Sequence, residues 1–130
     1  MHAGEERDMT IALALLLLLQ VFSGVRSTVE RKGPKLPQRE KNCQLEFLEA
    51  NAERPREVVG VIQVWVTRNK ITMGRQAVYE EAEPEIRKQA CKLGAEGVVV
   101  GQQTVSHTGE FKLLYVKAEA VRFPSGAPQH

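Results

Sequence analysis

The fold is decided by residues 84–106, which read PEIRKQACKLGAEGVVVGQQTVS. The first part of this stretch predicts a helix over 84–93. Ile86, Ala90 and Leu93 recur at the spacing i, i+4, i+7, so they lie on one apolar face that can pack on a sheet. The β-branched residues that follow predict a strand. The stretch therefore predicts a helix that leads directly into a strand.

Short local signals predict where this helix begins and ends. Pro84 suits the first helical position, because the N–H that proline lacks has no partner there. Gly94 suits the C-terminal cap, where the backbone is left-handed. Residues 76–82 have a helical composition, and we expect them to form a preceding turn or two with a bend at Pro84.

Other runs predict the strands of a sheet. Residues 43–47 alternate apolar and polar side chains, which is the pattern of a half-buried strand. The run EVVGVIQVWVTR at 57–68 is apolar on both faces, which favours a central position. A four-residue turn at 107–110 is expected to join a strand at 98–106 to a last strand at 111–123 as a hairpin.

These elements predict an α+β domain over residues 43–123. One helix is expected to pack on a four-stranded, mainly antiparallel sheet, in the order β-βαββ. The last strand should lie between the second and the third, as in a split βαβ unit. Its small residues Ala118 and Ala120 would let the helix approach closely. Residues 124–130 are expected to form a tail without core residues.

One helix cannot cover both faces of such a sheet, so the opposite face should expose apolar side chains. Trp65, Leu113 and Tyr115 are predicted to lie on that face. Exposed apolar patches indicate self-association or a partner. These three residues are therefore the candidate interaction face.

The N-terminal residues 1–27 are predicted to form a signal peptide. Residues 11–19 read IALALLLLL, which suits the apolar part of a signal peptide but is short of the ~20 residues of a membrane-spanning helix. Val25 and Ser27 suit the −3 and −1 positions of a cleavage site. The acidic residues upstream do not suit a signal peptide, which favours a translational start at Met9.

An uncleaved membrane anchor is the alternative interpretation of this segment. Four basic residues follow it, and the positive-inside rule would then hold the domain in the cytoplasm. These residues are Arg26, Arg31, Lys32 and Lys35.

Residues 28–42 are predicted to be a basic, disordered linker. Pro34 and Pro37 oppose regular structure, and the segment has five basic residues against two acidic ones. We expect either a solvated spacer or a tether that touches an anionic surface.

The two cysteines, Cys43 and Cys91, are predicted to form a structural disulfide. An exported chain meets an oxidising compartment, which favours the bridge. Cys91 lies on the last turn of the predicted helix and Cys43 begins the first predicted strand. A strand at the sheet edge would bring the two Cα atoms within the ~4.4–6.8 Å that a disulfide tolerates. A redox-active pair would more often be close in sequence.

Composition and residue types argue against several functions. The chain has 130 residues and a net charge of +2, without the clustered basic excess of nucleic-acid-binding proteins. The histidines His2, His107 and His130 make no metal set. The acidic residues within 80–85 lack a calcium-binding pattern and are expected to form a charged helix face. We expect no catalytic residues, no cofactor and no metal site.

Three segments resemble a pattern of small bacterial envelope proteins. They are QACKLGAEGVVVG at 89–101, AVRF at 120–123 and RPREVVGVIQV at 54–64. The pattern is that of the YbjQ-like family, labelled heavy-metal-binding, and of the Rcs-type stress-sensor lipoprotein, which share a βαββ core. The resemblance implies an envelope location, disulfide use as in the sensor, and ring-like oligomers as in the YbjQ-like proteins. The sensor has four cysteines and a lipid anchor, whereas this chain has two cysteines and no lipid-attachment motif.

Together these features predict a non-enzymatic, periplasmic or secreted envelope domain. We expect it to bind a protein or an envelope component through its sheet face, with self-association as a further expectation. The alternative is a ring-forming protein that binds a small ligand or a metal.

Overall fold

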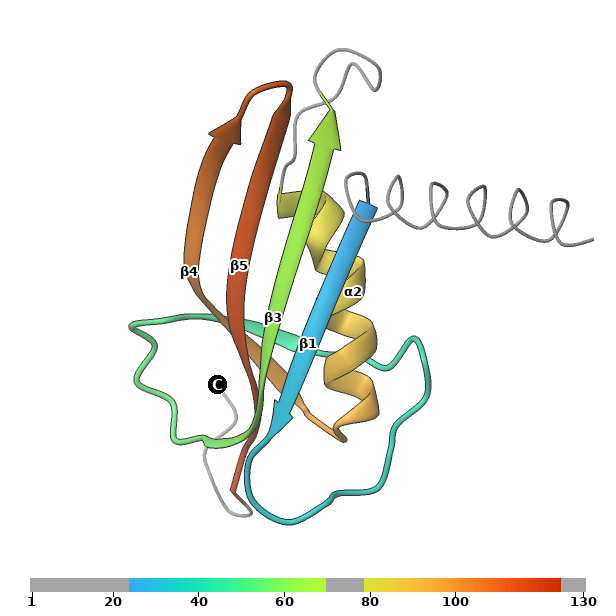
Figure 1. The fold of residues 1–130 in the computed structure, drawn as a ribbon. Coiled ribbons are helices and arrows are strands. Elements are labelled where there is room, and N and C mark those ends of the chain that lie inside the picture. The colour runs from blue at the N-terminus through green and yellow to red at the C-terminus, as the bar shows by residue number, and fades with distance from the viewer. Residues whose placement is uncertain (1–23, 70–78, 125–130) are drawn as a thin grey trace, which may run out of the picture.

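A computed structural model describes residues 24–69 and 79–124, which form one mixed sheet with one helix on one of its faces (Figure 1). In the view of Figure 1 the strands lie in front of the helix. The elements are β1 (Gly24–Arg31), β2 (Glu46–Glu49), β3 (Glu57–Asn69), α2 (Tyr79–Lys92), β4 (Gly97–Thr108) and β5 (Phe111–Arg122).

The sheet has five strands in the order β1-β3-β5-β4-β2. The first four strands in this order form three antiparallel pairs, whereas β2 pairs parallel with β4. Because β3 and β4 are both antiparallel to β5, they run in the same direction with β5 between them. The predicted place of the last strand in a split βαβ unit is therefore confirmed.

The predicted fold class is wrong in strand number and sheet type. A four-stranded, mainly antiparallel sheet was expected, but the sheet has five strands and is mixed. The additional strand is β1, which spans the predicted cleavage position and the start of the predicted linker. Its apolar residues Val25 and Val29 are four apart and over a third exposed, so β1 lacks an alternating pattern. Backbone pairing with β3 holds it in place.

The segment after β1 belongs to the domain. Leu36 packs against the core, and the Arg39 N–H donates to the Cys91 carbonyl at 2.9 Å. The Arg39 guanidinium also donates to the carbonyl oxygens of Gln44 and Ala95. This arrangement differs from the disordered linker expected over 28–42, because composition does not reveal contacts made with the end of a distant helix.

The core lies between α2 and one face of the sheet. The helix contributes Ala82, Ile86 and Ala90, which are fully buried at the spacing i, i+4, i+8. Ala118 and Ala120 of β5 are also fully buried, as expected of small residues beneath a helix. Other core residues of the sheet include Ile62, Val64, Val66, Val98, Leu114 and Val116.

The helix begins before its predicted start. Tyr79 is its first residue, and Pro84 lies inside it rather than at its first position. Pro84 is exposed, so water can bond the carbonyl that the missing N–H leaves unpaired near the helix start. Of the expected preceding turn, residues 76–78 lie outside the described residues.

The helix ends at the predicted glycine. Gly94 has a φ of +78°, a conformation that favours glycine. Its N–H donates to the Cys91 carbonyl at 3.1 Å, and the Ala95 N–H donates to the Ala90 carbonyl at 3.0 Å. These are the two bonds of a Schellman motif, which confirms the predicted cap.

The hairpin between β4 and β5 is tighter than predicted. His107 and Thr108 continue β4 and pair with Lys112 and Phe111, which leaves a two-residue turn in place of the expected four. Gly109, the first turn residue, has a φ of +58°. Glycine at this position is typical of a type II′ turn, which matches the twist of the flanking strands.

The predicted disulfide between Cys43 and Cys91 is confirmed, with the two Cα atoms 5.9 Å apart. Cys91 is buried on the last turn of α2, as expected. Cys43 lies in the loop before β2 rather than in a strand, since β2 begins only at Glu46. The bridge therefore fixes the segment before β2 to the end of the helix.

Replacing both cysteines by serine should lower the free energy of unfolding by about 2–4 kcal/mol, because the bridge closes a long loop of the unfolded chain. Urea denaturation measures this loss, and the reduced natural chain should match the variant. Hydrogen exchange should rise first in residues 36–45. Unchanged stability, or exchange that rises first in β3 and β5, would contradict this role.

Candidate functional site

The three residues of the predicted interaction face lie on the side of the sheet opposite α2. Trp65 on β3 pairs directly with Tyr115 on β5, and Leu113 lies two residues away on the same face. Val64 and Val66, on either side of Trp65, point into the core beneath the helix. All three interaction-face residues are half-buried, and none belongs to the core.

The two aromatic rings form one contact on this face. The ring centroids of Trp65 and Tyr115 are 5.4 Å apart and the ring planes are tilted by 45°. The Tyr115 hydroxyl donates a hydrogen bond to Oε1 of Gln63 at 3.0 Å. This bond orients the hydroxyl, and both aromatic residues are partly exposed.

Arg26 on β1 adds a cation to this contact. It pairs with Trp65 across the strands, and its guanidinium carbon lies 5.5 Å from the Trp65 ring centroid. This distance is typical of a cation–π interaction. Sequence reasoning missed Arg26, because the pattern of β1 gave no sign of a strand. We call the set Arg26, Gln63, Trp65, Leu113 and Tyr115 the aromatic face.

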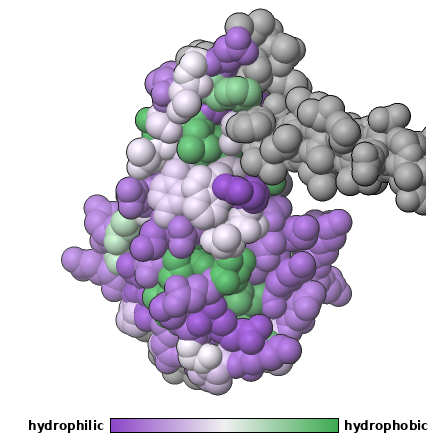
Figure 2. Space-filling view, viewed as in Figure 1, coloured by the Kyte–Doolittle hydropathy of each residue, from purple (hydrophilic) through white to green (hydrophobic). Residues whose placement is uncertain are grey.

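The surroundings of the aromatic face are polar and of mixed charge. Figure 2 shows pale and apolar surface on this side of the molecule, surrounded by hydrophilic side chains. Glu30 and Glu119 lie on this side as cross-strand neighbours of Val61, and Lys117 follows on β5. The hydrogen bond from Lys32 at 2.9 Å and the Lys32 charge lower the pKa of Glu30, so it stays ionised at neutral pH.

A polar contact with α2 holds β1, and thereby Arg26, in place. The Ser27 hydroxyl donates to Oε1 of Glu85 at 2.8 Å, and the Gln89 amide donates to the same oxygen at 2.8 Å. Burial raises the pKa of Glu85, but the bonds from Gln89 and Ser27 outweigh it, so the pKa is lowered overall. An ionised Glu85 therefore anchors the edge strand to the helix.

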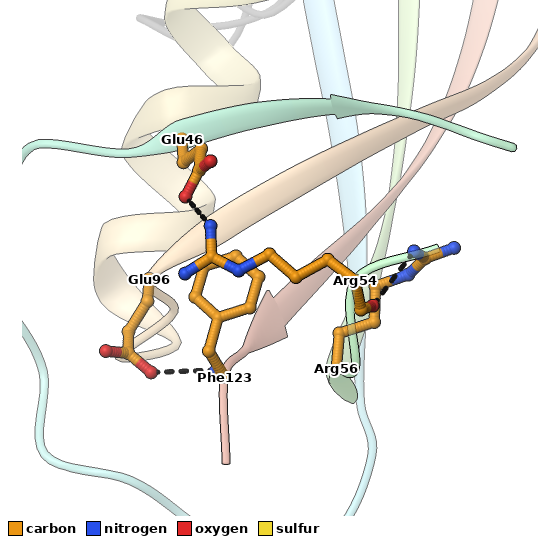
Figure 3. A network of polar contacts seen from close by, with 5 residues as sticks. All are labelled: Glu46, Arg54, Arg56, Glu96 and Phe123. Atoms are coloured by element: carbon orange, nitrogen blue, oxygen red, sulfur yellow. Dashed lines mark hydrogen bonds and ion pairs between the residues drawn. The ribbon is translucent and has the colours of Figure 1, made fainter. Parts of the chain in front are cut away.

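A second polar network closes the other end of the sheet (Figure 3). The Arg54 guanidinium stacks 3.5 Å from the Phe123 ring centroid and forms an ion pair with Glu46. The Phe123 N–H donates to the Glu96 carboxylate at 2.9 Å. Arg54 is thus engaged on two sides, and the network joins β2, the loop before β3 and the end of β5. We assign it a structural role.

Two of the helix acidic residues form ion pairs with arginines. Glu83 forms an ion pair with Arg87. Glu81 forms another with Arg68 of β3, in which Oε2 lies 3.0 Å from Nε. Residues 24–69 and 79–124 contain no group of three histidines, cysteines or carboxylates placed to hold a metal ion. His107 is exposed on β4, and His2 and His130 lie outside the described residues.

No protein-family model, curated protein or solved structure matches this chain. The function is therefore argued from the geometry of the aromatic face.

The position of Trp65 can be tested against that of its neighbour Val64. Trp65→Asp should cost about 2–3 kcal/mol, because it removes one aromatic pair, one cation–π contact and part of the buried ring area from a half-buried site. Val64→Asp should cost roughly 4 kcal/mol or more, because it places an unpaired carboxylate in the core. Circular dichroism with urea denaturation measures both losses, and equal losses would place Trp65 in the core.

Proposed function

We propose that this chain is a non-enzymatic, exported domain that binds a protein partner in the cell envelope through its aromatic face. The observation that supports this most strongly is the Arg26–Trp65–Tyr115 contact on a sheet face that α2 does not cover. Tryptophan, tyrosine and arginine are the residue types that dominate binding energy at protein interfaces. Charged residues of both signs around an apolar centre resemble the polar rim of such an interface.

A broad sheet surface suits a macromolecule better than a small molecule, which needs a concave pocket around most of its surface. The aromatic face draws its residues from three neighbouring strands, β1, β3 and β5. The ring-forming alternative, with a bound small ligand or metal, would have to use a different site, such as the pocket beside α2 that Lys41, Glu80 and Lys88 line. Binding of a protein partner is therefore the preferred proposal.

One observation supports a location in an oxidising compartment of the envelope. The Cys43–Cys91 disulfide is consistent with one. In the part of the chain that the structure describes, no helix is both long enough and apolar enough to span a membrane. A periplasmic or secreted location fits the disulfide, and an N-terminal anchor is the alternative.

The structure bears on where an N-terminal signal would be cut. Cleavage after Ser27 would remove four of the eight residues of β1, including Arg26, and with Ser27 it would remove the hydrogen bond from β1 to Glu85. Val21 and Ser23 supply another pair of acceptable −3 and −1 residues immediately before β1. We propose that cleavage follows Ser23, which keeps the strand whole.

The mass of the protein isolated from its native cells should therefore correspond to a chain that begins at Gly24. A chain that begins at Thr28 would contradict cleavage after Ser23 and would show that the mature protein does not contain the whole of β1. A chain that retains residues 9–23 would support the membrane anchor instead.

Binding can be tested with a photo-reactive benzoyl-phenylalanine placed at Leu113 in the native cells. The control carries the same group at Lys88, an exposed residue of α2. We expect protein adducts from position 113 that are absent from position 88 and that are lost with Trp65→Ala. The same adducts from both positions, or adducts with non-protein material only, would contradict the proposal.

A further inference from the structure

The outer side of β4 is only partly covered by a neighbouring strand. β2 pairs with residues 97–100, and a register shift between Val100 and Gln103 marks a bulge beyond them. Residues 103–108 pair with β5 on one side, and no strand of the described chain pairs with their other side. All six residues are exposed, with Val105 at 50%. We call residues 103–108 the β4 edge.

Apart from the bulge that precedes it, the β4 edge has none of the charges or prolines that usually protect a sheet edge. Its sequence, QTVSHT, contains no lysine, arginine, carboxylate or proline. Proteins usually protect exposed edges with charges, prolines or short strands, because unpaired backbone groups attract another strand. The opposite edge, β1, has Arg26, Glu30 and Arg31. The two edges of the sheet therefore differ in their readiness to pair.

We propose that two copies of the chain pair antiparallel through their β4 edges and form a two-fold dimer. In a register centred on Val105, this residue faces the partner's Val105. Thr104 then faces the partner's Ser106, and such hydroxyl pairs stabilise neighbouring strands. Gln103 faces the partner's His107. No formal charge lies opposite a like charge, which is why a second copy suits this edge.

The backbone supports the same register. In a two-residue hairpin the closing pair, Thr108 and Phe111, exchanges both hydrogen bonds, and such pairs alternate along the ladder. Residues 103, 105 and 107 therefore direct their N–H and C=O groups away from β5. A two-fold axis at Val105 brings these outward groups opposite those of the partner.

The dimer would be closed and would present two binding surfaces on one side. The contact uses the same edge of both copies, so it ends growth instead of building a fibre. The two five-stranded sheets join into one continuous sheet of ten strands. An axis perpendicular to the sheet keeps both aromatic faces on the same side, where Thr104 and Ser106 neighbour Tyr115 and Leu113. Dimerisation itself does not depend on what the aromatic face binds.

Sedimentation analysis of the chain purified after export tests the interface. The natural chain should be a dimer, and Val105→Lys should weaken self-association roughly tenfold or more, because it places like charges opposite each other. The matched control Val29→Lys, at an exposed valine of the β1 edge, should leave the dimer intact. Trp65→Asp should also leave it intact, so the dimer and the proposed function can fail separately.

Cysteine cross-linking tests the register without weakening the contact. Both native cysteines are in the disulfide, so a new cysteine is the chain's one free thiol. Oxidised Val105→Cys should give a covalent dimer, whereas Val29→Cys should not. A monomeric natural chain would overturn the proposal. Linkage only between Val105→Cys and Val29→Cys copies would also overturn it and would indicate a ring or fibre built from unlike edges.

Discussion

The close packing of one helix on the middle of the sheet is the constraint on which the rest of this structure depends. A helix is about 10 Å wide and strands are ~4.8 Å apart, so α2 can cover roughly two strands. It packs mainly against β3 and also contacts β1 and β5, where Ala118 and Ala120 of β5 allow close approach. The exposed large apolar residues Val25, Val29 and Val105 lie toward the margins of the sheet, on β1 and on the part of β4 beyond its pairing with β2.

The same packing determines the two surfaces to which we assign binding. Side chains alternate along a strand, so burial of Val64 and Val66 beneath α2 places Trp65 on the opposite face. Peripheral contacts then complete that face. The hydrogen bond from Ser27 to Glu85 holds β1, and β1 carries Arg26 to the Trp65 ring. The binding surface thus depends on an edge strand that the helix anchors from the other side.

The sequence allowed prediction of the elements that the core dictates. The spacing of Ile86 and Ala90, the cap at Gly94 and the alanines of β5 are direct consequences of burying one helix face on one sheet face. The cysteine pair could also be predicted, because the end of the helix was known and an exported chain favours a bridge. The face on which Trp65 lies could be predicted because side chains alternate along a strand.

The remaining features depend on contacts that no local pattern encodes. β1 is polar and lies at an edge, so its pairing with β3 leaves no alternation to read. Arg26 was missed with it. Arg54 acts through Glu46 and Phe123, which come from two other segments. The sheet is mixed because the short β2 pairs parallel with β4. A strand of four residues has too short a hydrophobic pattern to predict its partner or direction.

The central claim is that α2 closes one sheet face and leaves the other open for a protein partner. Trp65 is the only tryptophan of the chain, so its fluorescence reports on the open face alone. Acrylamide quenching should be measured on the free protein and on the complex isolated with its cross-linked partner, and the same complex made with Trp65→Phe supplies the partner's own fluorescence for subtraction. We predict that Trp65 is readily quenched in the free protein and protected in the complex. A Trp65 that acrylamide cannot reach in the free protein, or that is quenched equally in both, would contradict the account.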